Sequence, residues 1–416
     1  MALPNNILQN VQTYNKADLA YLQNNNCFIS TANKKYRDFQ KANPANLGDT
    51  ITFDKPPRFV ANNGLVVNFQ GVEQRVQTLT VDQAKNVGIN VSAQQLIFNL
   101  DEYMNRFGKA AIEELGAVVE ADMATLCETA PYRFFGNGIT PVNSFNQLAQ
   151  ALAFFRNFGA AKNDTKGYLS DIIIPDIIGS GLNQFVPASN EELRNSWELG
   201  AFAKCDWYSS NLLPEHIAGT EGQAGSTLTV VSVTTDSDGA ITGITFSGTS
   251  AASDADSVKI YDRFQFQDNV SGQNNVRFRT FVGHKPSASP VQFKATANAA
   301  STGGSQVTVT ISPALQAAQG KNQNITQQIV AGMQVKVLPS HRVGMIQSGN
   351  QFYAAIPPLP DCDPFMTSVE TDMETGANLR MYTGAQFGQD LYGTVHDIIW
   401  GKTQVDDNAM AVIFPL

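Results

Sequence analysis

Leu228-Thr-Val-Val-Ser-Val233 begins a series of short runs that are rich in β-branched and aromatic residues. The series continues with Ile241–Phe246, Val276–Val282 and Val307–Ile311, and clusters of Gly and Asp separate the runs. Runs of this length between turn residues are typical of the strands of a small barrel or sandwich. The sequence therefore predicts a compact β-barrel between about residues 222 and 338.

The predicted barrel interrupts a chain of a different character. Helical periodicity precedes it and further strands follow it, which indicates a domain inserted into a host domain. The predicted fold class is therefore α+β. We expect five parts in chain order: an N-terminal arm at 1–48, an extended β-hairpin loop at 49–98, a spine helix with the first part of an α/β body at 99–221, the inserted β-barrel domain at 222–338, and the closing strands of the body at 339–416.

The composition limits the class of protein. With 416 residues, 43% hydrophobic and 16% charged, the chain is too apolar for disorder and long enough for two or three domains. A net charge of −9 argues against a dedicated nucleic-acid-binding protein, which needs a basic face. The N-terminus lacks the pattern of a signal peptide, and no apolar run reaches the roughly 18 residues of a membrane helix. We expect a folded protein made in the cytosol, with no membrane partner.

The residues that carry chemistry are scattered. The four cysteines lie far apart with no CxxC spacing, which favours neither a zinc site nor a disulfide framework. No phosphate-binding loop, nucleophile elbow or metalloprotease motif is present. The histidines have no partner at metal-ligand spacing, so we expect four loop or strand-end residues, with a site assembled only by the fold as the alternative: His216, His284, His341 and His396. We predict no enzyme activity, no catalytic or metal-binding residues and no cofactor.

A long spine helix is predicted after the extended loop. Asn99 is a suitable N-cap and Glu102 occupies the third helical position, as in a capping box. Apolar residues then recur at three- and four-residue steps to about Glu128: Met104, Phe107, Ala111, Leu115, Val118 and Leu126. At about 1.5 Å per residue such a helix spans roughly 40 Å.

Further elements follow in the body. Ser144 and Gln147 form a second capping box, which predicts a helix extending to about residue 158. The apolar run 168–174 predicts a buried strand, and a third helix is expected over 189–202. Alternating apolar residues predict strands again within 339–416.

Two groups of exposed charges are candidate contact sites. Basic residues gather on the predicted loop, where they form either a solvated face or a contact between subunits: Lys55, Arg58, Arg75 and Lys85. Asp236-Ser-Asp238-Gly239 begins like a calcium loop but lacks the later oxygen ligands, so a hairpin turn between two strands is the favoured interpretation.

Several stretches resemble one known family. Gly48-Asp-Thr-Ile-Thr-Phe-Asp-Lys-Pro-Pro-Arg-Phe59 is similar to the opening of the long loop in the major coat proteins of short-tailed Salmonella-type phages. Leu79-Thr-Val-Asp82, with Lys85 and Val87-Gly88 after it, resembles the returning strand of that loop. Leu100-Asp-Glu-Tyr103 with Arg106 resembles the start of the family's spine helix. The order of the parts agrees along nearly the whole chain, whereas the inserted domain has no clear residue match.

This resemblance implies the tailed-phage capsid fold: N-arm, extended loop, long spine helix, peripheral and axial domains, and an insertion domain. The implied function is that of a major capsid protein, whose pentamers and hexamers close an icosahedral phage head around double-stranded DNA. The implied partners are further copies of the chain, a scaffolding protein, a portal protein and the packaged DNA, which touches the inner surface non-specifically. Such a subunit assembles in the host cytoplasm, matures by expansion and ends in the virion.

Two finer expectations accompany the resemblance. Asp18 is the only acidic residue before Asp38, which makes it the candidate contact for a basic scaffold element. Asp236 and Asp238 are candidates for contact across neighbouring capsomers. The alternative function is a β-rich binding or adhesion module, which four aromatic residues of the inserted domain suggest: Tyr261, Phe264, Phe266 and Phe278.

Overall fold

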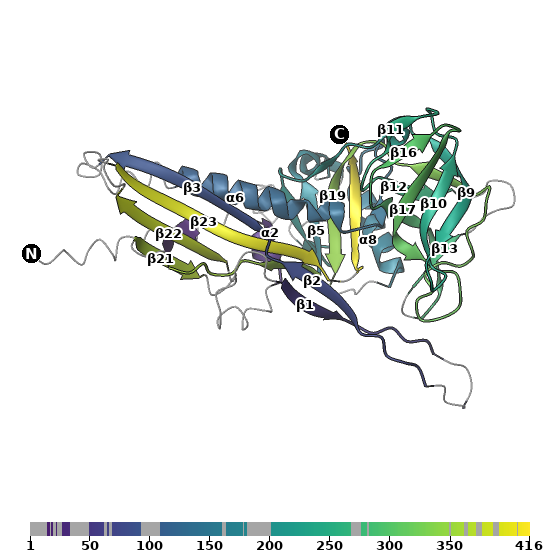
Figure 1. The fold of residues 1–416 in the computed structure, drawn as a ribbon, viewed down its shortest axis with the longest axis horizontal. Helices are drawn as coiled ribbons and strands as arrows, with labels where there is room; N and C mark the ends of the chain where they lie inside the picture. Colours follow the sequence, from purple (N-terminus) through teal and green to yellow (C-terminus); the bar gives the residue numbers. More distant parts are fainter. Residues whose placement is uncertain are drawn as a thin grey trace, which may run out of the picture. The chain divides into compact units, whose positions relative to one another are not determined.

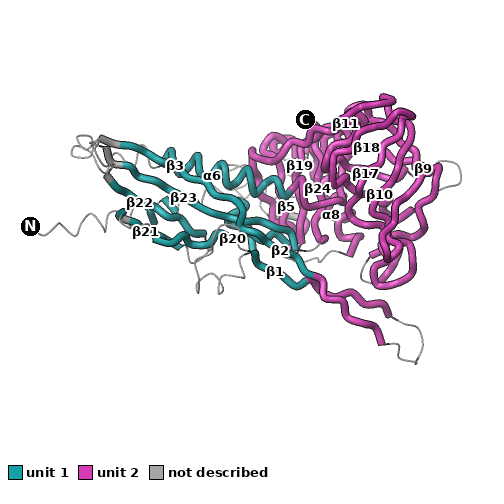
Figure 2. The backbone as a smooth tube through the Cα atoms, in the orientation of Figure 1, with its two compact units in different colours: residues 1–54, 76–126, 350–405 teal, residues 55–75, 127–349, 406–416 magenta. Residues whose placement is uncertain are grey.

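The structure is a computed structural model in which the chain divides into two compact units (Figure 2). Unit 1 comprises residues 1–54, 76–126 and 350–405, and unit 2 comprises residues 55–75, 127–349 and 406–416. The structure describes residues 15–16, 18–19, 22, 27–33, 50–61, 65, 69–92, 109–159, 164–177, 179–180, 201–267, 276–280, 283–348, 351–361, 365–371, 377–385, 391–405 and 407–416.

Unit 1 is built on a five-stranded sheet whose longest strand is β23 (Leu391–Gln404). Three strands pair antiparallel with β23: β22 (Asn378–Ala385), β3 (Gln83–Ser92) and, along residues 401–404, β20 (Phe352–Ala355). β21 (Met366–Thr371) extends the sheet beyond β22. These strands confirm the closing strands that the sequence predicts.

Helix α6 (Lys109–Ala124) runs along β3 and β23 (Figure 1). Its buried residues include Ile112, Leu115, Val119 and Met123, whose three- and four-residue spacing places them on one face. Thr125 forms a turn, after which α7 (Leu126–Thr129) begins. Residues 109–129 confirm the second half of the predicted spine helix, and the predicted cap at Asn99 lies outside the described residues.

The segment 49–98 does not form one hairpin. β1 (Thr50–Lys55) pairs with β2 (Arg75–Thr80), and the base of this hairpin packs in a small cluster that includes Leu79, Val81 and Ile399. β3, expected as part of the hairpin, pairs instead with β23. The alternation of apolar residues in β3 correctly predicts a strand with one buried face, but alternation does not identify the partner strand.

Unit 2 contains a mixed sheet, which forms the α/β body. Its order is β4 (Phe134–Phe135), β24 (Ala409–Pro415), β19 (His341–Ser348), β5 (Thr165–Ser170), β7 (Cys205–Ser210) and β6 (Ala201–Phe202), with β8 (Glu215–His216) paired to β19. Helix α8 (Phe145–Asn157) contributes Leu148, Leu152 and Phe155 to a cluster with Val412 and Phe414 of β24. The capping box at Ser144 and Gln147 is confirmed.

Two predictions for the body are corrected. β5 ends at Ser170, and residues 171–177 form a 3₁₀ turn followed by α9 (Ile174–Ile177) instead of continuing the strand. A short apolar run fits a buried strand and a buried helical segment equally well, so its pattern does not decide between them. Most of the third predicted helix lies outside the described residues, and its last two residues are strand β6.

A closed six-stranded β-barrel is present in unit 2, within the residues 222–338 where the sequence predicts a barrel. Its six strands are β9 (Thr227–Thr235), β10 (Ile241–Ser247), β12 (Arg263–Phe266), β15 (Gln292–Ala295), β17 (Gln306–Leu315) and β18 (Gln334–Val337). They pair in the order β10-β9-β18-β12-β15-β17, and the pairing of β17 with β10 closes the ring. Outside this ring lie β16 (Ala299–Thr302), β11 (Asp254–Val258) and the pair β13 (Arg277–Arg279) and β14 (Pro286–Pro290).

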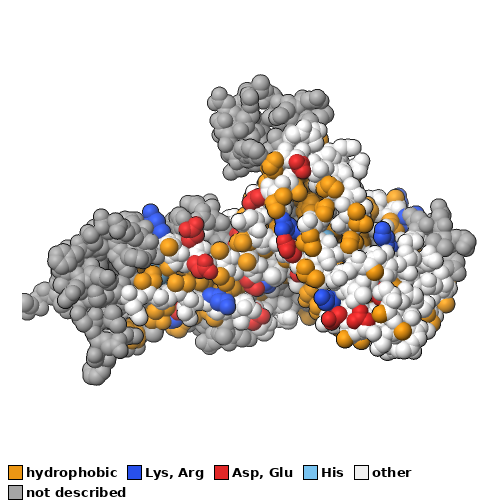
Figure 3. Space-filling model, turned by 90° about the horizontal axis from the view of Figure 1, so that it is seen from above, with side chains coloured by type: hydrophobic (Ala, Val, Ile, Leu, Met, Phe, Trp, Pro, Cys, Tyr) orange, Lys and Arg blue, Asp and Glu red, His pale blue; other side chains and the backbone are white. Residues whose placement is uncertain are grey.

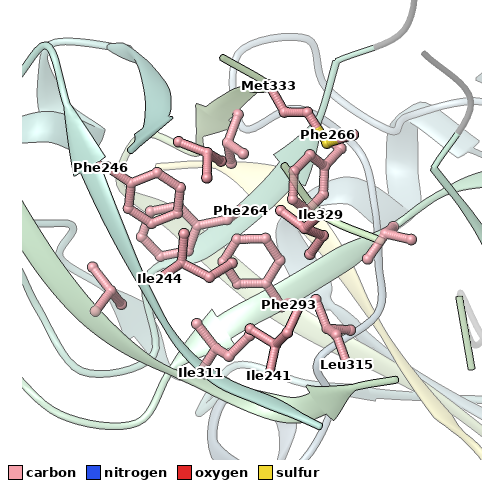
Figure 4. Packing of buried hydrophobic residues seen from close by; sticks show 14 of the residues in the cluster. Ile241, Ile244, Phe246, Phe264, Phe266, Phe293, Ile311, Leu315, Ile329 and Met333 are labelled. Atoms are coloured by element: carbon pink, nitrogen blue, oxygen red, sulfur yellow. The ribbon is translucent and has the colours of Figure 1, made fainter. Parts of the chain in front are cut away.

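Three phenylalanine rings form the centre of the barrel (Figure 4). The ring centroids of Phe264 lie 5.9 Å from Phe246 and 5.1 Å from Phe293, with interplanar angles of 6° and 5°. Aliphatic residues such as Ile244 and Ile311 surround the rings. Closure removes most exposed strand edges, and the filled interior leaves this barrel with a packed core instead of a ligand cavity.

Candidate assembly surface

The loop between β1 and β2, residues 55–75, exposes large apolar side chains. Leu65 is fully exposed, Phe69 is 92% exposed and Val72 is 69% exposed, and Phe59 shows about half of its surface. Isolated apolar residues on a surface are ordinary, but four within one loop form a group that a partner can cover. The loop is therefore the part of the described chain with the clearest signs of an interface.

Hydrogen bonds between Val60 and Gln70 join the two arms of the loop. The backbone N–H of Val60 donates to Gln70 Oε1 at 3.0 Å, and Gln70 Nε2 donates back to the carbonyl of Val60. Pro56 and Pro57 precede this contact and offer no N–H groups to a strand ladder. Side-chain bonding thus replaces a β-ladder where the strands β1 and β2 stop.

Polar contacts connect the described residues of the loop with the rest of unit 2. Lys321 Nζ lies 2.6 Å from Glu73 Oε1, and this pair lowers the pKa of the Glu73 carboxyl. His284 Nε2 lies 3.3 Å from the carbonyl oxygen of Phe59. Exposed ion pairs contribute about 0–1 kcal/mol. The exposed Lys321–Glu73 pair is therefore a weak contact.

The basic residues predicted as intersubunit contacts divide into two groups. Lys55 and Arg75 are half-buried and flank the loop, and Arg58 lies 3.5 Å from Asp407 Oδ2 within unit 2. Lys85 is exposed on β3, which belongs to unit 1. The structure therefore places Lys55, Arg58 and Arg75 around the base of one loop but assigns Lys85 to a different sheet. Their role between subunits stays a prediction.

Asp236 and Asp238 lie in the turn that joins β9 to β10, as predicted. Asp236 Oδ1 accepts hydrogen bonds from the N–H groups of Asp238 at 3.0 Å and Ala240 at 2.8 Å. Both carboxylates are exposed at this hairpin tip. The turn is thus stabilised by its own side chain, and a contact across capsomers remains an untested prediction.

Asp18 is not placed as a scaffold contact requires. Its side chain is buried in unit 1, and its Oδ2 lies 3.2 Å from Nε2 of the fully buried His396. A carboxylate enclosed by its own chain offers no surface charge to a basic partner, so we withdraw Asp18 as the scaffold contact. His396 also departs from expectation, because it lies within β23 and not at a strand end.

Unit 2 contains a buried charged cluster that the sequence did not reveal. His216 of β8 has Glu128 Oε1 at 2.8 Å from Nδ1 and Asp262 Oδ1 at 2.8 Å from Nε2. Asp262 and Arg263 are fully buried, and the ring centroid of His341 lies 5.2 Å from that of His216. These residues come from four separate segments, so no spacing in the sequence could have identified them. Among the described residues no group has an arrangement able to hold a metal ion.

Burial and hydrogen bonds move the pKa values of this cluster in different directions. Burial opposes the charged form of His216, but hydrogen bonds to Asp262 and Glu128 outweigh it and raise the pKa. Burial, with the nearby Arg263 charge, lowers the pKa of His341 to about 3. Burial also lowers the pKa of Arg263 to about 10 and that of Lys294 to about 7. The network therefore holds two neighbouring imidazoles in different protonation states.

The aromatic residues considered for a binding surface are mostly part of the barrel core. Phe264, Phe266 and Phe278 are buried, and only Tyr261 is partly exposed. A sugar-binding face requires exposed aromatic rings, so this arrangement does not favour the adhesion-module alternative. Charged side chains on the face in Figure 3 are scattered singly or in small groups, with no continuous basic patch. No described helix is long and apolar enough to cross a membrane.

Comparison with known proteins gives remote structural similarity alone. No family model and no curated protein matches the chain. The chain is similar to a structure from Mycobacterium phage Che8, with 8% identity over 93% of this chain and 90% of that one and a TM-score of 0.45. It is also similar to the capsid of Ralstonia phage GP4 (6% identity, 89% and 84% covered, TM-score 0.41) and the capsid of cyanophage P-SCSP1u (9%, 89% and 84%, TM-score 0.40).

Proposed function

We propose that this chain is a structural subunit of a phage capsid. The observation that carries the proposal is the group of four exposed apolar side chains in the loop 55–75. The sequence resemblance over residues 48–128 supports it, because those residues correspond to the loop, the returning strand and the spine helix of phage coat proteins. The long β23, the helix α6 and the closed barrel are consistent with the order of parts in that family.

The loop would act as a clamp on a neighbouring subunit. Complete burial of a Leu, Val or Phe side chain contributes about 1.5–3 kcal/mol. Burial of Leu65, Phe69 and Val72 would therefore contribute about 5–9 kcal/mol at each contact, against the loss of translational freedom on association. In a shell every subunit both gives and receives such a clamp. Contacts that are modest singly then become strong through repetition.

The assembled form is proposed from the resemblance. The subunits would form pentamers and hexamers of an icosahedral head that encloses double-stranded DNA, meet a portal protein at one vertex, and rearrange when the head expands. All contacts would be non-covalent. The protein would be made in the host cytoplasm and end as a virion component. A net charge of −9 agrees with contact with DNA that is passive and non-specific.

A separate scaffolding protein is part of the proposal. The resemblance implies a coat protein that assembles on such a scaffold. Docking that depends on charge weakens as salt increases. Because Asp18 is buried, the Asp18→Asn substitution should leave scaffold binding unchanged and instead alter the stability of unit 1. Uniform shells formed by the chain alone would contradict the need for a scaffold.

Electron microscopy of the purified protein with its scaffold tests the function directly. A shell subunit gives closed shells or sheets of hexamers, whereas a binding module gives discrete small particles. Sedimentation that shows only stable monomers or dimers under all conditions, scaffold included, would overturn the proposal. No described feature favours the binding module, because three of its four candidate aromatic residues are buried: Phe264, Phe266 and Phe278.

A further inference from the structure

The positions of the hydrogen-bonding atoms determine the protonation of His216. Both ring nitrogens lie 2.8 Å from carboxylate oxygens, one of Glu128 and one of Asp262. An ionised carboxylate only accepts hydrogen bonds, so both nitrogens must carry protons and the ring must be an imidazolium. With Glu128 and Asp262 both ionised, His216 is therefore a cation that bridges two anions.

The neighbouring His341 is held in the opposite state by the same logic. Arg263 Nη1 lies 3.0 Å from His341 Nε2, and a guanidinium can only donate. Nε2 must therefore accept, which leaves the single ring proton on Nδ1, where it is donated to the carbonyl of Pro339 at 2.6 Å. His341 is consequently neutral beside a charged His216.

The His216 bridge connects two parts of unit 2. Glu128 lies in α7, which leads into the body, whereas Asp262 directly precedes barrel strand β12. Asp262 Oδ2 is itself fixed by the N–H groups of Lys259 at 2.8 Å and Gly219 at 3.2 Å. Asp262 is fully buried and His216 is 3% exposed, so water cannot replace a lost partner readily.

The other charged groups around His216 come from every neighbouring element. Arg263 of β12 donates from Nη2 to the backbone carbonyl of Glu128 at 3.0 Å, which adds a second link between barrel and body. Lys294 of β15 donates to the carbonyl of Ala130 at 3.0 Å. On β8 itself, Glu215 pairs with Arg342 of β19 near the surface. Among the charged groups that the structure describes, the carboxylates of Glu128 and Asp262 are the ones that contact the imidazole of His216 directly.

We propose that Glu128, His216 and Asp262 form a proton-dependent clasp, which holds the inserted barrel on the body and loosens in mild alkali. Loss of one proton leaves a ring lone pair facing a carboxylate at 2.8 Å, so a buried attraction becomes a buried repulsion. The clasp belongs to the single subunit and does not depend on the proposed role in a shell.

The direction of the pH effect follows from linkage. The pKa of His216 is raised in the closed clasp and returns toward about 6.5 when the clasp opens. Below about pH 6.5 His216 is protonated in both the closed and the open clasp, and the clasp has its full stability. As the pH rises from there toward the raised pKa, only the closed state holds the proton, and the opening constant increases by up to about tenfold per pH unit.

Hydrogen exchange on the full-length chain tests the clasp. The amide of Phe134 donates to Gln292 Oε1 of the barrel at 3.0 Å, and the amide of Gly219 donates to Asp262, so both report opening. After correction for the intrinsic pH dependence of exchange, we expect their opening to increase by up to about tenfold per pH unit above 6.5. This increase should be absent in His216→Gln, where the titration of Lys294, whose pKa burial lowers to about 7, acts in the opposite direction, and it should be unchanged in the matched control His284→Gln.

Two further measurements keep the test decisive if His216→Gln does not fold. In Glu128→Gln the imidazole loses one anion, so opening should begin at a lower pH than in the wild type. NMR titration of the wild-type imidazoles should show one histidine with a pKa above 6.5 and one that stays neutral to well below pH 5. A His216 pKa at or below 6.5, or the same pH dependence with and without the His216 side chain, would overturn the proposal.

Discussion

The double substitution Leu65→Ser and Phe69→Ser should abolish assembly without changing the fold of the subunit. Leu65 is fully exposed and Phe69 is 92% exposed, so neither side chain contributes appreciably to the packing of the free chain. We therefore expect the free energy of unfolding to change by less than about 0.5 kcal/mol. If a neighbour buries both side chains, the contact loses about 3–6 kcal/mol, which corresponds to a factor of about 10² to 10⁴ in its association constant.

Light scattering during scaffold-assisted assembly measures this effect as the protein concentration at which shells first form. The matched control is Ile139→Ser, because Ile139 is 65% exposed in unit 2 but lies outside the loop. The protein concentration at which this variant first forms shells should equal that of the wild type. Circular dichroism melting of all three proteins checks the fold. An assembly threshold for the double variant within threefold of the wild-type value, or a clear fall in its melting temperature, would refute the reasoning.

Four further outcomes are expected. Arg58→Glu with Arg75→Glu should slow assembly more than it lowers the melting temperature, and equal losses in both assays would place these residues in the core of the subunit. Phe293→Ala should destabilise the barrel by about 3–5 kcal/mol, seen as a lower urea midpoint, because it removes the ring next to Phe264 from a filled interior. Residues 222–338 expressed alone should give dispersed amide NMR signals and a cooperative melt, whereas a collapsed spectrum would contradict an independent domain. Burial lowers the pKa of His341 to about 3, so the neutral ring contributes its full stability above pH 6.5. Between pH 6.5 and 3 the free energy of unfolding should fall by up to about 1.4 kcal/mol per pH unit, because the unfolded chain binds a proton that the folded chain does not. His341→Gln should make the free energy of unfolding, measured by denaturation at a series of pH values, less dependent on pH in this range.

Local sequence patterns were sufficient for the elements whose signals are local. The runs around Leu228, Ile241 and Val307 became barrel strands β9, β10 and β17, because alternating β-branched residues with turn residues between them favour strands wherever they pack. The capping box at Ser144 and Gln147 started α8 where predicted, since both partners lie within one helical turn.

Local sequence patterns did not predict strand pairing or burial that depends on residues far along the chain. The strand β3 was predicted, but its pairing with β23 was not, because alternation specifies a buried face and leaves the neighbour open. Asp18 looked like an exposed charge in a polar arm, yet tertiary packing encloses it beside His396. In both cases the missing information lay in a segment far along the chain.

The sequence by itself thus determined the β-rich segment 222–338, the helix over residues 109–124 and the presence of strands within 339–416. Only the tertiary structure closed the barrel through the β10–β17 pairing and brought Glu128, His216 and Asp262 together. The physical reason is the range of the interactions. Propensity, capping and turn chemistry act over a few residues and therefore produce a recognisable sequence pattern. A buried charge network depends on which distant segments pack together, so no local sequence pattern indicates it.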